Sequence, residues 1–265
     1  MKLRTAAALA PTLAIVAGAL VGVAGCGTTT ELDANPVAAV QKAADNTRLV
    51  GSSKVFSEVT FEEGRSKNVL RSEGVYDFEK NLGKSQMDLP APVSGKAESI
   101  VTSNALFVRG RTVSQPDKWR QFDFTKLGTD ALRQAAPTDP SVALELLRGA
   151  TENVKKVGEE DVDGVRTTHY EGALRVKQAL GAAPSNSMAA MVGQSLGGVD
   201  ELTIPFHAYL DEEGRVRKLQ ETMAFRTLFA NKTSKVTTGT IVMILRDFGT
   251  PAEINVPTPA QVQRG

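Results

Sequence analysis

Gly193-Gln194-Ser195-Leu196-Gly197 is the stretch of this chain whose residue types and spacing could do covalent chemistry. It matches G-x-S-x-G, the turn that presents the serine nucleophile of α/β-hydrolases, and Asp200 and His207 stand nearby in sequence. That turn needs a buried parallel strand before the serine and a helix after it. Here a segment of helical composition precedes Ser195 and glycines follow, which indicates a helix that ends in glycine. We therefore expect that the protein is not an enzyme, and we reject the alternative that it is a serine esterase using Ser195.

The remaining titratable residues do not form a recognisable metal or acid/base site. His169 and His207 are the only histidines and fall on different expected strands, with no Cys, His or carboxylate at metal-ligand spacing. The acidic runs Glu159-Glu160-Asp161 and Asp211-Glu212-Glu213 lie in or beside glycine-containing turns, where solvated carboxylates are common. No phosphate-binding or dinucleotide-binding glycine motif is present. We expect no metal and no cofactor, and histidines that are hydrogen-bonded or solvated on their strands.

Cys26 is the only cysteine, and its surroundings predict a modification. Basic residues in 1–4 precede an uncharged apolar run that ends in Val23-Ala24-Gly25-Cys26, the pattern of a secretory signal peptide. These four residues resemble a bacterial lipobox. The resemblance implies that residues 1–25 are removed and that Cys26 receives a diacylglyceryl group. The alternatives are a transmembrane helix, which Pro11 and the absence of a following basic cluster disfavour, and a free or disulfide-bonded thiol.

A diacylglyceryl group would act as a stable anchor. Each buried methylene contributes about 0.8 kcal/mol, so one acyl chain binds a membrane reversibly and two hold it firmly. Residues 26–35 are mostly polar or small and show no apolar periodicity, which is typical of a flexible tether. We therefore expect a protein anchored in the cell membrane and folded on its extracytoplasmic face.

The rest of the chain reads as strands with a few helices between them. Asn35-Pro36 and Asp139-Pro140 each pair a helix N-cap with proline at the first helical position. Between and after these helices apolar residues alternate with polar ones, and Glu63-Gly64-Arg65-Ser66 and Asp163-Gly164 provide hairpin turns. Pro116 to Phe124 and Thr240 to Phe248 are read as strands, and residues 186–196 as a helix. This order predicts an α+β fold in which a curved antiparallel sheet, a half-open barrel, wraps around two or three helices in a single domain over residues 36–262.

Composition limits the partners of that domain. The chain has 31 Lys and Arg against 30 Asp and Glu, and no basic cluster with interleaved aromatic residues, so we expect no nucleic acid. Its folded part has no cysteine left for a disulfide, and aromatic residues make up only 5% of the chain. Stability must therefore come from a core of mainly aliphatic side chains, which a chain of this length can bury.

Four segments carry a resemblance to a known family. Asp161-Val162-Asp163-Gly164-Val165-Arg166-Thr167-Thr168-His169-Tyr170-Glu171-Gly172, the tryptophan segment DKWRQFDF, the hairpin AYLDEEGRVRKLQ and the closing ILRDFGTPAEINVPTPAQV resemble the actinobacterial LppX/LprG-type lipoproteins. That family is similar in fold to LolA-like lipoprotein carriers. The resemblance covers about residues 36–262. It implies an incomplete barrel around helices, a hydrophobic cavity, and binding of acylated lipids or glycolipids without an active site.

The expected function is thus a membrane-anchored envelope lipoprotein that binds acylated lipid or lipoglycan in an apolar cavity and carries it across the envelope. Apolar side chains at helical and strand spacing are the candidates for the cavity lining: Val59, Phe61, Leu70, Leu144, Leu147, Met188, Met191, Ile204, Phe206, Met223 and Phe225. The alternative is a surface lipoprotein that acts as an interaction or sensory module without a lipid ligand. An envelope protein partner is left open in both cases.

Overall fold

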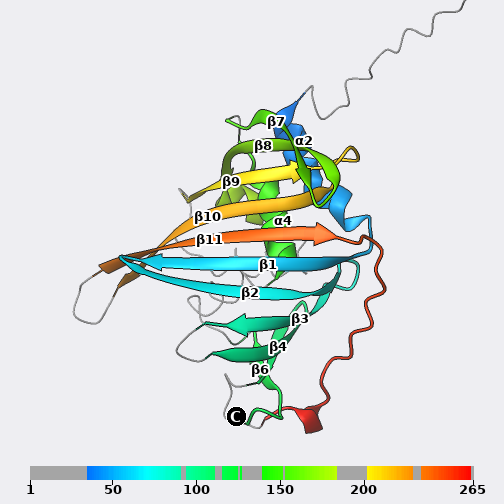
Figure 1. The fold of residues 1–265 in the computed structure, drawn as a ribbon, viewed down its shortest axis with the longest axis vertical. Coiled ribbons are helices and arrows are strands. Elements are labelled where there is room, and N and C mark those ends of the chain that lie inside the picture. The colour runs from blue at the N-terminus through cyan, green and yellow to red at the C-terminus, as the bar shows by residue number, and fades with distance from the viewer. Residues whose placement is uncertain are drawn as a thin grey trace, which may run out of the picture.

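Residues that alternate between apolar and polar along most of the chain form one antiparallel sheet of eleven strands (Figure 1). The computed structural model describes residues 35–90, 94–110, 115–124, 126, 139–151, 153–183, 202–228 and 234–263, and the side chains at 63, 224–228 and 234–237 lie outside this description. The strands are Ser52–Glu63 (β1), Ser66–Asp77 (β2), Leu82–Leu89 (β3), Gly95–Val101 (β4), Ala105–Gly110 (β5), Arg120–Asp123 (β6), Lys155–Val162 (β7), Val165–Arg175 (β8), Thr203–Leu210 (β9), Val216–Leu228 (β10) and Ser234–Arg246 (β11).

The sheet is an open meander made of two runs. Its order is β6-β5-β4-β3-β2-β1-β11-β10-β9-β8-β7, so β1 and β11 join the runs, with Val59 opposite Ile241. Every ladder between these strands is antiparallel. The two edge strands β6 and β7 are not paired with each other. The expected half-open antiparallel sheet is therefore confirmed.

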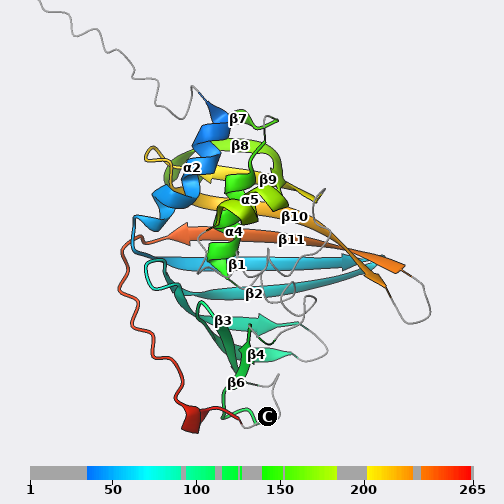
Figure 2. The ribbon, with the colours of Figure 1, turned by 180° about the vertical axis from the view of Figure 1, so that it is seen from behind.

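Two helices form where the caps predicted them, and together with a third they lie on one face of the sheet (Figure 2). They are α2 (Pro36–Arg48), α4 (Pro140–Leu146), which continues into a 3₁₀ turn η2 (Leu147–Gly149), and α5 (Val176–Ala182). The Asn35 side chain accepts a hydrogen bond from the Ala38 N–H at 3.0 Å. The Asp139 Oδ1 accepts one from the Ser141 N–H at 2.8 Å. In both helices proline occupies the first turn, where its missing N–H costs nothing.

The register divides the sheet into two faces, because successive side chains point to opposite sides. We call the face turned toward α4 and α5 the inner face. It carries Val55, Val59 and Phe61 of β1, Leu70 of β2, Met87 of β3, Ala97 of β4, Val108 of β5, Phe206 of β9, Leu219, Glu221 and Met223 of β10, and Ile241 and Met243 of β11.

The main core lies between the helices and the inner face of β8 to β11. Leu144 and Leu147 are fully buried and belong to one cluster with Ile204, Phe206 and Leu219. This cluster is the mainly aliphatic core that the composition predicts. Because α2, α4 and α5 have one apolar stripe each, burying those stripes fixes the helices against this part of the sheet.

A second, smaller cluster lies on the outer face of β4 and β5. Ile100, Phe107 and Trp119 are buried there, against Ile254 and Val262 of the C-terminal segment. The Trp119 N–H donates to the Gln261 carbonyl at 2.9 Å, and the Gln263 N–H donates to the Trp119 carbonyl at 2.7 Å. Figure 1 shows this segment running from the end of β11 past the ends of the neighbouring strands to the region of β6.

Two expected strands differ in their bounds from the structure, and one helix forms that was not expected. The strand around the tryptophan is shorter, since β6 begins at Arg120 and Trp119 instead bridges Val262. The last strand ends at Arg246, and Phe248 turns away to pack under the Arg217 guanidinium, 3.9 Å from the ring centroid. Helix α5 was not expected, because it follows β8 without a turn or cap residue. The helix expected over 186–196 lies outside the described residues.

Candidate functional site

The predicted cavity residues of the strands whose side chains the structure describes map to the inner face. Val59, Ile204 and Phe206 are buried there, Leu70 and Met223 are half-buried, and Phe61 is 37% exposed. Leu144 and Leu147 are fully buried in the helices and pack in the main core. Met188, Met191 and the side chain of Phe225 lie outside the described residues. Whether these residues line a cavity stays a prediction.

The inner face continues beyond the helices over β2 to β6. Met87, Ala97 and Val108 are buried there, and around them lie the half-buried side chains of Leu70, Leu89, Leu106 and Phe122. Within the described residues, Figure 2 shows α2, α4 and α5 over β1 and β8 to β11 and no helix over β3 to β6. Among the described residues, this part of the inner face is therefore an apolar surface over which no helix packs.

A buried ion-pair network holds the helices in place. Glu145 of α4 is fully buried, and its carboxylate lies 3.3 Å from the Arg48 Nη1 of α2 and also accepts from the Arg148 Nε. Arg148 reaches a second carboxylate, that of Asp45, at 2.6 Å, and this pairing lowers the pKa of Asp45. Two arginines thus compensate one buried charge and tie α2 to α4.

Glu221 is a buried acidic residue among the mainly apolar side chains of the inner face. Its side chain is 1% exposed, and neither carboxyl oxygen has a hydrogen-bond partner. Burial raises its pKa to about 8. In the sequence Glu221 is in phase with Leu219 and Met223, and no functional role was predicted for it. An acid in phase with an apolar strand face is the signal that would have singled it out.

The histidines are brought together on the outer face. His169 of β8 and His207 of β9 face each other with 3.0 Å between Nε2 and Nδ1, and the His169 ring stacks on Tyr209 with 4.3 Å between centroids. Burial, more than any other cause, lowers the pKa of His169. Among the described residues no three His, Cys, Asp or Glu side chains are placed to hold a metal. The interpretation as hydrogen-bonded strand histidines is confirmed.

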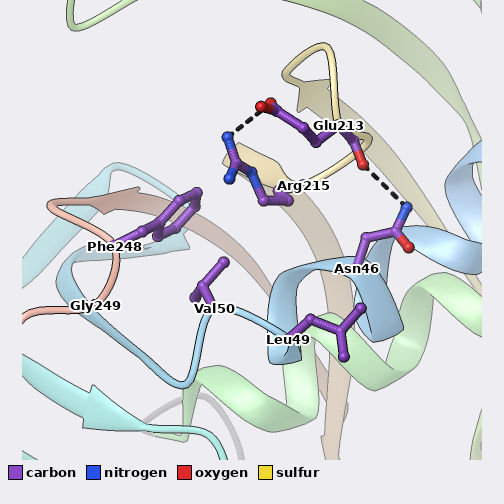
Figure 3. A pocket seen from close by; sticks show the side chains of 7 residues that line it. All are labelled: Asn46, Leu49, Val50, Glu213, Arg215, Phe248 and Gly249. Carbon is purple, nitrogen blue, oxygen red and sulfur yellow. Dashed lines mark hydrogen bonds and ion pairs between the residues drawn. The ribbon is translucent and has the colours of Figure 1, made fainter.

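A pocket of about 420 Å³ lies where the end of α2 meets the β9–β10 hairpin and the turn after β11 (Figure 3). It is lined by Asn46, Leu49, Val50, Glu213, Arg215, Phe248 and Gly249. Its one cation, Arg215, pairs with Asp211 and Glu213 at 2.8 Å and 2.7 Å. None of the predicted cavity residues lines it, and its charges satisfy one another.

The other sequence candidates lie outside the described residues, namely Cys26 with the tether and the signal peptide, and Ser195 with its glycines. Over the described part of the chain, no helix has the length and apolarity to span a bilayer. The parallel strands that a serine elbow requires do not occur among the described strands, whose ladders are antiparallel.

Comparisons with known proteins give likenesses of fold. The chain is similar to the lipoprotein LppX of Mycobacterium tuberculosis, with 14% identity over 83% of this chain and 97% of that chain and a TM-score of 0.49. It is similar to LprF of Mycobacterium bovis, with 12% identity over 85% and 98% and a TM-score of 0.48. A LolA superfamily protein of Nitrosomonas europaea gives 12% identity over 79% and 93% and a TM-score of 0.31. No protein-family model and no curated protein matches the chain. The first of these structures is a lipoprotein that the sequence resemblance also named, and the likeness concerns the fold alone.

Proposed function

We propose that this protein is a membrane-anchored envelope lipoprotein that shelters the acyl chains of a lipid or lipoglycan against the inner face of its sheet. The observation that carries the proposal is the extent of that face. It is mainly apolar from β11 across β1 to β5, with single serines between the apolar side chains of β1 to β4, whereas the described helices pack mainly against β8 to β11. Burying acyl chains there would be driven by apolar area, at about 25 cal/mol per Å². In this proposal the chain is a carrier and not an enzyme.

The anchor is the second part of the proposal. A diacylglyceryl group on Cys26, followed by the tether over 26–35, would keep the domain at the membrane surface. Growth with a radiolabelled palmitate should label the wild-type chain and leave Cys26→Ser unlabelled. Equal labelling of both would refute the anchor while leaving the carrier proposal intact.

Adjacent residues of β2 allow a matched test of the carrier. Leu70 and Val69 are both half-buried and point to opposite faces of the sheet. We expect Leu70→Arg to lose bound lipid, because a charge among acyl chains must be desolvated. Val69→Arg should keep it. Native mass spectrometry of the Cys26→Ser chain, purified without detergent, followed by solvent extraction, measures the bound lipid.

Circular dichroism would establish that both variants fold. A wild-type protein that carries no extractable lipid, even after incubation with host membrane lipids, would contradict the carrier. It would favour the interaction module that the sequence leaves as the alternative.

A further inference from the structure

Glu221 lies on the inner face of β10, in a row of apolar side chains that crosses the neighbouring strands. Its register partners are Ile241 on β11 and Phe206 on β9, and Val59 of β1 follows beyond Ile241. All three are buried. Along its own strand Leu219 and Met223 precede and follow it on the same face. Glu221 is therefore an acid placed in the middle of an aliphatic and aromatic surface.

The other buried acids of the described chain all have partners. Asp77 pairs with Lys80, Glu145 with two arginines, and Asp211 with Arg215 and Arg217 at 2.8 Å each. Asp139 caps a helix. Glu221 alone among them has both carboxyl oxygens unpaired. A buried polar group without a partner lowers the stability of the fold. The unpaired carboxyl group of Glu221 therefore needs a reason other than stability.

The surroundings of Glu221 set its chemical form. The described inner-face residues of the neighbouring strands β9 and β11 carry no charge, and burial alone raises its pKa to about 8. At neutral pH the side chain is therefore a carboxylic acid, with one O–H donor and acceptor capacity on its oxygens. No described residue around Glu221 supplies a cation for an anionic head group. A pure hydrocarbon would leave the acid unpaired.

We propose that Glu221 is the polar recognition point of the inner face, and that its carboxyl group hydrogen-bonds an uncharged ester or hydroxyl group held between the acyl chains of the ligand. This inference rests on the proposed function and narrows its ligand class. The ligands it selects are neutral acyl esters, such as acylglycerols or acylated polyols, in preference to hydrocarbons of similar size. Glu221 acts in recognition and not in bond breaking.

Trioleoylglycerol and squalene are suitable probes, because both are large and apolar and only the first has ester groups. Their dissociation constants would be measured on the full Cys26→Ser chain after lipid removal, for wild type, Glu221→Leu, Glu221→Gln and Gln220→Leu. Glutamine keeps a donor and an acceptor. Gln220 is half-buried on the opposite face of the same strand, so Gln220→Leu controls for the loss of a polar side chain.

We expect Glu221→Leu to bind trioleoylglycerol about tenfold more weakly, the value of one hydrogen bond, and squalene no more weakly than wild type. Glu221→Gln and Gln220→Leu should stay within about threefold of wild type for both probes. Equal trioleoylglycerol affinity in Glu221→Leu and wild type would overturn the inference and leave the carrier standing. A wild-type chain that binds neither probe would overturn both.

Infrared difference spectra of the wild-type chain give a second test that needs no variant to fold. The C=O stretch of a protonated carboxyl group should shift when trioleoylglycerol binds and stay in place with squalene. A band that does not move with trioleoylglycerol would overturn the inference, since the acid would then have kept a water or no partner.

Discussion

The two runs of the sheet carry the same alternation but differ in what covers their inner face. On β8 to β11 the inner-face side chains meet Leu144, Leu147 and their neighbours on the helices, and they form one large core. On β2 to β6 they form a small cluster around Met87, Ala97 and Val108, and no described helix lies over β3 to β6. An apolar strand face therefore has two uses in this fold, to hold the domain together and, as we propose, to hold a ligand.

The largest expected effect concerns Glu221, the buried and unpaired acid on the inner face of β10. Below about pH 4.5 the carboxyl group is protonated in both the folded and the unfolded chain. As pH rises from there to about 8, the unfolded chain loses the proton and the folded chain keeps it, so the free energy of unfolding falls. With 1.36 kcal/mol for each pH unit between these pKa values, the loss is at most about 5 kcal/mol.

Glu221→Gln should remove this slope, and urea unfolding between about pH 5 and pH 9 measures it. Glu73→Gln, an exposed acid on β2, is the control and should keep the wild-type slope. A Glu221→Gln chain that loses stability with pH as steeply as wild type would show that other groups cause the loss.

The next effect separates the two runs directly. Leu144→Ala removes a fully buried side chain from the core and should lower the free energy of unfolding by about 3 to 5 kcal/mol. Leu70→Ala, on the inner face of β2, removes a half-buried one and should cost about 1 kcal/mol in the lipid-free chain. Bound lipid should increase the loss of unfolding free energy caused by Leu70→Ala and leave the loss caused by Leu144→Ala unchanged. Equal losses of unfolding free energy at both sites would show that the inner faces of the two runs do not differ in how they are packed.

A smaller effect tests what holds the helices to their run. Arg148→Met leaves the buried carboxylate of Glu145 with Arg48 as its remaining arginine, and should cost about 2 to 3 kcal/mol. Lys67→Met removes a cation from the exposed pair with Glu62 at the β1–β2 hairpin and should cost less than about 1 kcal/mol. Thermal unfolding of both variants measures the two losses of unfolding free energy. If Arg148→Met loses as little as Lys67→Met, the network adds no net stability.

Local signals predicted much of the fold. The caps at Asn35 and Asp139 and the hairpins at Glu63–Ser66 and Asp163-Gly164 stand where residue chemistry placed them. The phase of Ile204 and Phe206 was right because alternation fixes a strand face once the strand is known. What failed depends on distant partners. Trp119 leaves the expected strand because Val262, far along the chain, bridges to it.

The site was less predictable than the fold. The alternation of β10 was readable, including Glu221 in its apolar phase, but the lack of any partner for that acid follows from its neighbours on β9 and β11. The meeting of His169 with His207 likewise depends on the register between β8 and β9. Spacing along one chain does not reveal which side chains become neighbours across strands.

The most direct test of the central claim is where an acyl chain lies when bound. A fatty acyl ester with a photoreactive diazirine on its chain would be crosslinked to the Cys26→Ser protein and the modified residues mapped by peptide mass spectrometry. The account predicts adducts at inner-face residues of β2 to β5, such as Leu70, Met87 and Val108, and none at outward-facing Val69 or Phe107. Adducts confined to the outer face, or to the pocket around Leu49 and Phe248, would contradict it.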